Sequence, residues 1–560
     1  MLVFNIEELE RIAENHLQTK NYLNCAQTLS LIADFFINKN DEEKYNFYYQ
    51  KILNCFKISA EQEDIDFMEA AERWCGAACL AKDIDLNEYK KCVNKMVESL
   101  ESAALNALKK ENYNDAGEYY QQAGKYIKDE LDDKKFQNFF KKAIECYSKI
   151  INVRISPDQK EELAKFYIKI ARLYEELDDQ ANALNLYNEA IQAIESNKIV
   201  SSYELLAKIY NYKAKCLQKY PVEKVDPEDL ILKSINYLSL EADKNLELKN
   251  YLKAAENLCL ANNLYEKIQK KELNIKNLII KEANCYKYVA DMLKSNGDIL
   301  QAAKFERDAA FCYYKLNDHN KAIKLLLITA EQMENEKQYL ISAENYRDAS
   351  LVYDQLKDYI NCGECAFKGG NLAKIGGDEY SALENFKIAF NCFSKIGEKD
   401  LIHKCKKELT NCLSKIAEGE IEVKNYHLGG TYLFEAAKYE DNEDLYRSYL
   451  GRSLDSYLKA IDIAIDDSNF FIAAYSLCCA GLVMVLLNRT NDIINILKEY
   501  PELNNERYTL FLNDFVNSIL TKDISNQKLK NIKEKYYKLI SNSNEIQNLV
   551  SLIEQRVGEN

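Results

Sequence analysis

The sequence predicts an all-α protein, a right-handed solenoid of antiparallel helical hairpins that ends in a C-terminal helical bundle. Three observations support this prediction. The 560 residues include only 16 Gly and 4 Pro, too few for the turns that strands and phosphate-binding loops require. Good helix formers such as Leu, Ala, Glu and Lys are abundant. A motif of one aromatic and two small residues also recurs at a spacing that suits single helices.

The repeated motif is an aromatic residue, two variable positions and then two small residues. Positions i, i+3 and i+4 share one helix face, so the aromatic ring and the small pair lie together. The small pair lets a neighbouring helix approach closely, and the ring fills the space beside that contact. We therefore expect a packing role. The packing positions are Tyr22, Tyr113, Tyr251 with Ala254 and Ala255, Tyr339, Tyr359, Tyr426 with Gly429 and Gly430, and Phe470 with Ala473 and Ala474.

The spacing of the copies predicts the length of the hairpin. Strong and weak copies begin at residues 299, 319, 339, 359 and 379, which are 20 residues apart. This length accommodates a helix of about four turns and a short connection. A hairpin of two helices then spans 40 residues. It is longer than the tetratricopeptide hairpin of about 34 residues and close to HEAT and armadillo units of about 40 to 47.

Proline placement indicates where the array is interrupted. Pro221 and Pro227 are two of the four prolines and lie close together, which is typical of a boundary. Asp226 before Pro227 is also a favoured helix start, because an Asp caps the first turn and Pro suits its first position. The expected parts are a helical-repeat array in 1–219, a linker in 220–229, a second array in 230–497 and a C-terminal helical bundle in 498–560.

Charge and cysteine content narrow the class of protein. The net charge of −15 argues against a general nucleic-acid binder, whose surface should be basic. The first residues lack the basic and apolar regions of a signal peptide, and 17 irregularly spaced cysteines suit reduced thiols. We therefore expect a cytoplasmic protein. The most apolar run, 470–487, is rich in small residues and predicts a buried helix in place of a membrane span.

Residues that usually carry chemistry form no recognisable site. The four histidines include no His-x3-His pair, and no glycine-rich phosphate-binding motif occurs. Cys362 and Cys365 form the one C-x-x-C motif, but the spacing to Cys392, Cys405 and Cys412 matches no common zinc module. Cys362 occupies a small-residue position of the repeat, where cysteine serves in close packing. We expect no catalytic residue, metal, cofactor or small-molecule substrate, and hence no enzyme.

Tyrosine is unusually abundant, with 40 copies against 21 Phe and one Trp. Many tyrosines lie at repeat positions, where a buried ring and a hydroxyl at the rim are expected. Others, such as Tyr313 with Tyr314 and Tyr536 with Tyr537, could instead project from a concave groove as anchors for a partner. Both interpretations are open at this stage, and core packing is the default.

The 40-residue hairpin with its aromatic and small-residue face resembles the soluble NSF attachment protein (SNAP) family. The segment 425–437 resembles that family in its pattern of aromatic and small residues. The segment 498–507 is similar to the family's aromatic-Pro helix end and Arg-containing turn. The segments 510–519 and 529–556 resemble its closing bundle. The resemblance implies tetratricopeptide-like hairpins whose concave face binds a SNARE four-helix bundle. It also implies a C-terminal end that recruits an AAA ATPase, and work in vesicle trafficking at the membrane periphery.

A lysine run in the C-terminal bundle is the candidate partner-binding feature. Two interpretations are open, a docking surface and a solvated helix face. The SNAP-like function predicts a basic stripe along the concave face despite the acidic total charge. The alternative, a tetratricopeptide-type scaffold in an unrelated complex, allows that face to be acidic or aromatic. The run consists of Lys528, Lys530, Lys533, Lys535 and Lys538.

Overall fold

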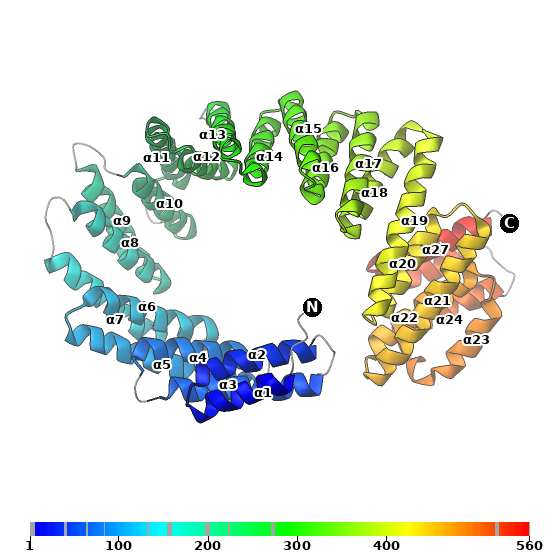
Figure 1. The fold of residues 1–560 in the computed structure, drawn as a ribbon, viewed down its shortest axis with the longest axis horizontal. Helices are drawn as coiled ribbons and strands as arrows, with labels where there is room; N and C mark the ends of the chain where they lie inside the picture. The colour runs from blue at the N-terminus through cyan, green and yellow to red at the C-terminus, as the bar shows by residue number, and fades with distance from the viewer. Residues whose placement is uncertain are drawn as a thin grey trace. The chain divides into compact units, whose positions relative to one another are not determined.

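The computed structural model describes residues 6–37, 42–62, 65–82, 85–131, 134–153, 159–196, 202–221, 225–269, 275–520 and 526–558. Across these ranges the regular secondary structure is helical and no strand occurs (Figure 1). The helices repeat along the chain as antiparallel hairpins, so the predicted all-α fold class is confirmed. The chain divides into two compact units, Met1–Leu278 and Ile279–Asn560.

In the first unit, each helix packs against the next one along the chain. Its α-helices are α1 (Ile6–Gln18), α2 (Tyr22–Ile37), α3 (Glu42–Ala60), α4 (Phe67–Lys82), α5 (Leu86–Lys109), α6 (Tyr113–Tyr126), α7 (Phe136–Val153), α8 (Lys160–Glu176), α9 (Gln180–Glu195), α10 (Tyr203–Lys219), α11 (Pro227–Glu247) and α12 (Tyr251–Glu266). A π-helical turn, Ile127–Leu131, extends α6.

The second unit begins within α13 (Ile275–Ser295) and continues the hairpin pattern. Its regular array consists of α14 (Ile299–Lys315), α15 (His319–Asn335), α16 (Tyr339–Gln355), α17 (Tyr359–Ile375), α18 (Glu379–Ile396) and α19 (Lys399–Glu422). The C-terminal helices are α20 (Tyr426–Tyr439), α21 (Glu443–Asp466), α22 (Phe470–Leu486), α23 (Thr490–Glu499), α24 (Arg507–Leu520), α25 (Asn526–Lys535), α26 (Tyr537–Ser541) and α27 (Asn544–Gly558). A 3₁₀ turn, Pro501–Leu503, precedes α24.

The connections explain the 20-residue step. Helices α14 to α17 are each 17 residues long, and the turn after α14 ends in Asn317 and Asp318. Asn317 has a positive φ of 59°, and the Asp318 amide donates to the Tyr313 carbonyl at 2.9 Å, which closes α14. The Asp318 side chain in turn accepts from the Lys321 amide and caps α15. One residue therefore ends a helix and starts the next.

The same turn precedes nearly every copy of the motif. In each case the residue two positions before the helix start lies in the left-handed region, although most are not glycine. These residues are Lys20, Glu111, Asp178, Lys249, Gly297, Asn317, Lys337, Lys357, Gly377, Lys424, Ser468 and Asn488.

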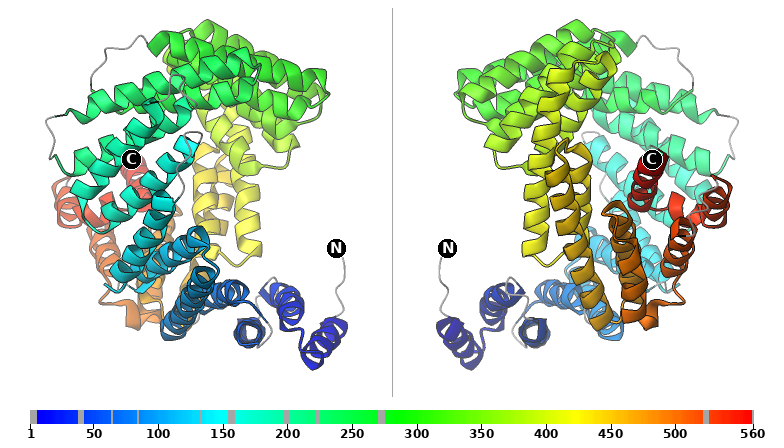
Figure 2. Two further views of the ribbon diagram at one scale, coloured as in Figure 1. Left: turned by 90° about the vertical axis from the view of Figure 1, so that its left-hand side faces the viewer. Right: turned by 90° about the vertical axis from the view of Figure 1, so that its right-hand side faces the viewer.

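The hydrophobic core is a series of local clusters along the chain. One cluster gathers α1 to α3, another runs from α3 to α8, and a third from α8 to α12. Separate small clusters join neighbouring helices of the regular array. The largest cluster of the second unit lies in the C-terminal bundle, where α22 contacts both α24 and α27 (Figure 2). This serial core is expected of a solenoid, because each hairpin buries its apolar face only against its neighbours.

The apolar run 470–487 forms α22, which is buried on almost every side from Ala473 to Leu486. Its surroundings are the helices of the C-terminal bundle. Among the described residues, no helix combines the length and the apolar character that crossing a bilayer requires.

The division after Leu278 falls within the second array expected from the sequence, 230–497. Residues 222–224 of the expected linker 220–229 lie outside the described residues, and α11 begins at Pro227. Leu217 of α10 shares a buried cluster with Leu230 and Ile231 of α11. Asp226 does cap α11 with Pro227 at its first turn, so the proline marks a helix start inside the first unit. Described residues of the expected bundle, among them Phe511 and Leu549, share a buried cluster with α20 to α22.

Candidate functional site

The motif residues lie at the start of their helices, where the aromatic residues are partly exposed and the small pairs are buried. Tyr22, Tyr113, Tyr251, Tyr339, Tyr359 and Tyr426 are each the first residue of a helix and are half-buried, whereas Phe470 is 40 % exposed. The small pairs are buried, including Ala254 and Ala255, Gly429 and Gly430, and Ala473 and Ala474. The small pair thus forms the helix contact, and the aromatic lies at its edge.

Glycines show how closely the helices approach. A Cβ added at Gly430 would lie 3.0 Å from the ring of Tyr457 on α21, and one at Gly370 would lie 2.7 Å from the ring of Phe386 on α18. Such distances are shorter than van der Waals contact, so these rings occupy the space that a side chain would need.

A ladder of ion pairs joins alternate helices of the regular array. Basic residues of α14, α16 and α18 lie 40 residues apart and reach acids on the next helix of the same layer. The exposed pairs of this ladder contribute about 0.2–1 kcal/mol each, so the ladder mainly sets register. Because each cation is paired, these three residues do not provide the predicted basic stripe. The pairs are Arg307 with Glu344 and Asp348, Arg347 with Glu384, and Lys387 with Glu435.

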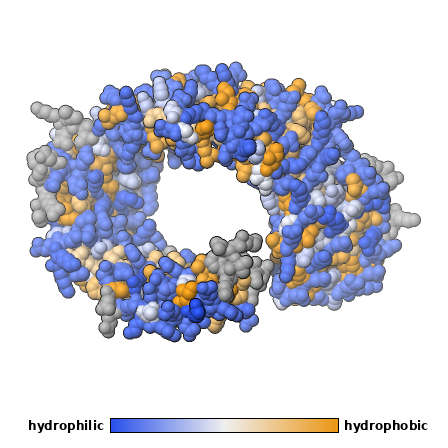
Figure 3. Space-filling view, viewed as in Figure 1, coloured by the Kyte–Doolittle hydropathy of each residue, from blue (hydrophilic) through white to orange (hydrophobic). Residues whose placement is uncertain are grey.

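An apolar groove of ≈ 330 Å³ lies between α14 and α16. Its floor includes Leu326 of α15 and Val352 of α16, which are 2 % and 5 % exposed. Phe311 and Leu351 also line the groove and are 43 % and 49 % exposed. A large aromatic and a large aliphatic side chain therefore face solvent above a buried apolar floor. Apolar residues, drawn in orange, interrupt the largely polar surface of the chain in several places (Figure 3).

Polar groups border this groove. Tyr314 accepts a hydrogen bond from the Gln355 side chain across the two helices. Asp348 is 7 % exposed and pairs with Arg307, and Asp354 pairs with Lys395 at 3.0 Å. The acids at the groove are thus neutralised by cations of the array.

The candidate lysines of the C-terminal bundle are partly engaged within the chain. Lys533 Nζ lies 2.9 Å from Glu554 Oε1, and Lys535 Nζ lies 2.7 Å from Asp514 Oδ2. The hydrogen bond from Lys535 lowers the pKa of Asp514. Lys538 is exposed, and the side chains of Lys528 and Lys530 lie outside the described residues. Two of the five lysines therefore form ion pairs within the bundle.

A buried polar cluster joins α27 to α20, α21 and α22. Glu545 accepts hydrogen bonds from Thr431 at 2.6 Å, from Tyr475 at 2.8 Å and from Tyr457. His427 Nε2 lies 3.3 Å from Glu545 Oε2, the oxygen that also accepts from Tyr475. Burial alone would raise the pKa of Glu545, but the hydrogen bonds and charge of His427, with those of Thr431 and Tyr457, lower it.

Sequence reasoning missed this cluster. It gave no role to His427 or to Glu545. Thr431 and Glu545 lie 114 residues apart, and no periodic pattern in the sequence predicts a contact over such a separation. The one available signal was that a carboxylate at the start of an apolar helix must find donors when it is buried.

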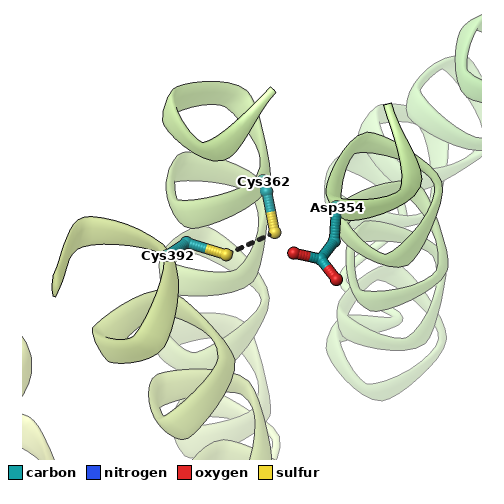
Figure 4. A group of neighbouring side chains, drawn as sticks. All are labelled: Asp354, Cys362 and Cys392. Atoms are coloured by element: carbon teal, nitrogen blue, oxygen red, sulfur yellow. Dashed lines mark hydrogen bonds between the residues drawn. The ribbon is translucent and has the colours of Figure 1, made fainter. Parts of the chain in front are cut away.

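The C-x-x-C motif does not act as a pair. Cys362 meets Cys392 of α18 at a sulfur–sulfur distance of 2.7 Å, with Asp354 of α16 beside them (Figure 4). Burial and the neighbouring Cys392 raise the pKa of Cys362. Cys365 packs elsewhere, and burial raises the pKa of its thiol to about 11.

Neither a protein-family model nor a curated protein matches the chain in sequence. Three of the similar solved structures are BtubC from P. vanneervenii, the C-terminal part of a TPR repeat-containing protein from Cytophaga hutchinsonii, and Naa15/Naa10 bound to HypK-THB. The identities are 14 %, 13 % and 12 %, and the TM-scores 0.18, 0.24 and 0.22. They cover 50 %, 52 % and 90 % of this chain and 90 %, 94 % and 98 % of those chains. The helical-repeat fold of this chain is established by its own helices and their contacts.

Proposed function

We propose that the chain is a non-catalytic scaffold that binds another protein through the apolar groove between α14 and α16. The observation that best supports this proposal is that Phe311 and Leu351 are 43 % and 49 % exposed above the buried floor of the groove. Exposed aromatic and aliphatic side chains over an apolar cleft are typical anchors for a partner.

The groove favours an apolar segment of helix as the partner. Its floor of Leu326 and Val352 offers contact to apolar side chains, and its nearby acids are already paired with Arg307 and Lys395. A strongly charged ligand would have to break those pairs. An amphipathic helix can lay its apolar face in such a groove and keep its polar face in water.

The test is site-specific photo-crosslinking with the full chain. A photoreactive residue in place of Leu351 should crosslink a partner from native extract, and the crosslink should map to an apolar helical face of that partner. The matched control is Ile328 of α15, which is 47 % exposed and lies outside the groove lining. Equal crosslinking at both positions, or a crosslink to an acidic disordered segment, would contradict the proposal.

The family resemblance extends the proposal to a SNAP-like adaptor that binds SNARE-like helical bundles and links them to an AAA ATPase. The apolar groove and the hairpin length support it. The pairing of Lys533 and Lys535 within the bundle weighs against a basic docking surface there. Lys538 is an exposed residue of the run, so Lys538→Glu should reduce any ATPase stimulation. A full chain that neither binds a SNARE four-helix bundle nor stimulates the ATPase would leave the unrelated scaffold as the function.

A further inference from the structure

Three potential metal ligands converge from three successive helices. Asp354 of α16, Cys362 of α17 and Cys392 of α18 place a carboxylate oxygen and two sulfur atoms all within 4.8 Å of one another. The cysteines are 0 % and 2 % exposed. One carboxylate oxygen of Asp354 points toward the Cys362 sulfur (Figure 4). No other such group occurs among the residues that the structure describes.

The chain contains a matched pair without the carboxylate. Cys25 and Cys55 are separated by 30 residues, as are Cys362 and Cys392, and each pair begins at the same motif position. Five residues before the motif aromatic, the first pair has Leu17 where the second has Asp354. The sulfur atoms of the first pair lie 3.6 Å apart. Paired cysteines alone thus serve in packing, and the added acid distinguishes the second site.

The geometry suits a small tetrahedral ion. Zinc binds thiolate sulfur at about 2.3 Å and carboxylate oxygen at about 2.0–2.2 Å, so neighbouring ligand atoms lie roughly 3.5–3.8 Å apart. The sulfur atoms, at 2.7 Å, would separate by about 1 Å through a small rotation of their side chains. A disulfide would need only the two sulfur atoms, and the carboxylate would have no part in it.

Lys395 completes the charge balance. Its Nζ donates to Asp354 Oδ1 at 3.0 Å, which holds the carboxylate in place in the way that outer hydrogen bonds orient metal ligands. Two thiolates and one carboxylate carry three negative charges. A divalent cation and Lys395 offset them, and binding releases the two thiol protons to solvent.

We propose that Asp354, Cys362 and Cys392 bind one thiophilic divalent cation of the zinc class, with the fourth position open to a water molecule. Asp354 also lines the apolar groove, so the ion lies at its edge. The cation ties α16, α17 and α18 together beside the groove. This inference is independent of what the groove binds.

The experiment is a Co²⁺ titration of the reduced, chelator-treated full chain. Co²⁺ replaces zinc in thiolate sites and gives a sulfur-to-metal charge-transfer absorption. One equivalent should produce that band, and Zn²⁺ should remove it by competition. Cys362→Ser and Cys392→Ser should each abolish the band. Asp354→Asn and Lys395→Met should weaken Co²⁺ binding by about tenfold or more.

The controls separate binding from folding and from other thiols. The double variant Cys25→Ser with Cys55→Ser should bind Co²⁺ as the unchanged chain does, and all variants should keep the helical circular dichroism. Absence of the band in the unchanged chain would overturn the proposal, as would its persistence in Cys362→Ser. Formation of a Cys362–Cys392 disulfide in the reduced, metal-treated sample would also overturn it.

Discussion

The regular array and the C-terminal bundle of the second unit use the same motif but hold together differently. In the array, the ion pairs of Arg307, Arg347 and Lys395 span 37 to 41 residues, which is one hairpin. In the bundle, Glu545 reaches back 70 to 114 residues to Tyr475, Tyr457 and Thr431. The array is a sum of neighbouring contacts, whereas the bundle is closed by one long-range polar centre.

This difference suggests that the end of a solenoid needs additional helices to cover its last hairpin. An internal hairpin is covered on both sides by its neighbours. The last hairpin, α21 with α22, would expose an apolar face, and α24 and α27 cover it instead. Terminal repeats of solenoids require such caps for solubility. Damage to the cap should therefore spread through the bundle, while damage to the array should stay local.

The largest effect is expected from Glu545→Ala. The change removes the shared acceptor of Tyr457, Tyr475 and Thr431 and leaves His427 without its carboxylate. Breaking a buried, hydrogen-bonded charged centre costs about 3–5 kcal/mol. We expect urea unfolding and hydrogen exchange to show a loss of that size across α20 to α22 and α27.

The control is Glu554→Ala on the same helix. Glu554 pairs with the half-exposed Lys533, so its loss should cost less than about 1 kcal/mol. Equal effects of the two changes would mean that Glu545 does not organise the bundle.

A smaller and local effect is expected from Gly370→Val in the array. The new Cβ would lie 2.7 Å from the Phe386 ring, and overpacking of this kind costs about 1–3 kcal/mol. Hydrogen exchange should rise in α16 to α18 and stay unchanged in α24 to α27. The control, Gly419→Ala in α19, meets nothing within 4 Å and should stabilise the helix by about 0.5–1 kcal/mol. Exchange that rises throughout the second unit after Gly370→Val would contradict local coupling.

Acid should weaken the bundle through Glu545. Its pKa is below the ordinary 4.5 in the folded chain, so its ionisation contributes stability above pH 4.5. That contribution should be lost as the pH falls through the lowered pKa. Tyr457, Tyr475 and Cys479 face Glu545, but burial raises their pKa values and keeps them protonated in this range.

The measurement is the stability of α20 to α22 by hydrogen exchange between pH 6 and the acid range, roughly the window in which carboxylates titrate. Glu545→Gln removes the titrating group and should flatten this part of the profile. A profile that is unchanged in Glu545→Gln would assign the acid sensitivity to other carboxylates.

The helices of the array were predictable because they follow from local pattern. The motif copies at residues 299 to 379 coincide with the starts of α14 to α18. Their turns were harder to predict, because only Gly297 and Gly377 are glycines whereas Asn317, Lys337 and Lys357 adopt the same left-handed backbone. The turns at Asn317, Lys337 and Lys357 therefore form without glycine, at the same position of each repeat.

The sites were not predictable, because they depend on contacts between helices. The groove needs Phe311 and Leu351 to be exposed at the same register, and periodicity alone places large apolar residues in the core. The meeting of Cys362 with Cys392 depends on helix packing and not on the C-x-x-C spacing that the sequence displays.

The smallest effect concerns the turns that give the array its regular step. Lys337 has a φ of 59°, which costs an L-residue about 1–2 kcal/mol, while glycine adopts it freely at the expense of a more flexible unfolded chain. Lys337→Gly should therefore raise the free energy of unfolding by about 0.5 kcal/mol. Gly377→Ala, at the equivalent turn with nothing within 4 Å, should lower it by about 1 kcal/mol. Because the contacts of the array join neighbouring helices, both changes should alter hydrogen exchange only in the helices on either side of the turn. A change of hydrogen exchange in the C-terminal bundle would show instead that the turns of the array are coupled to the cap.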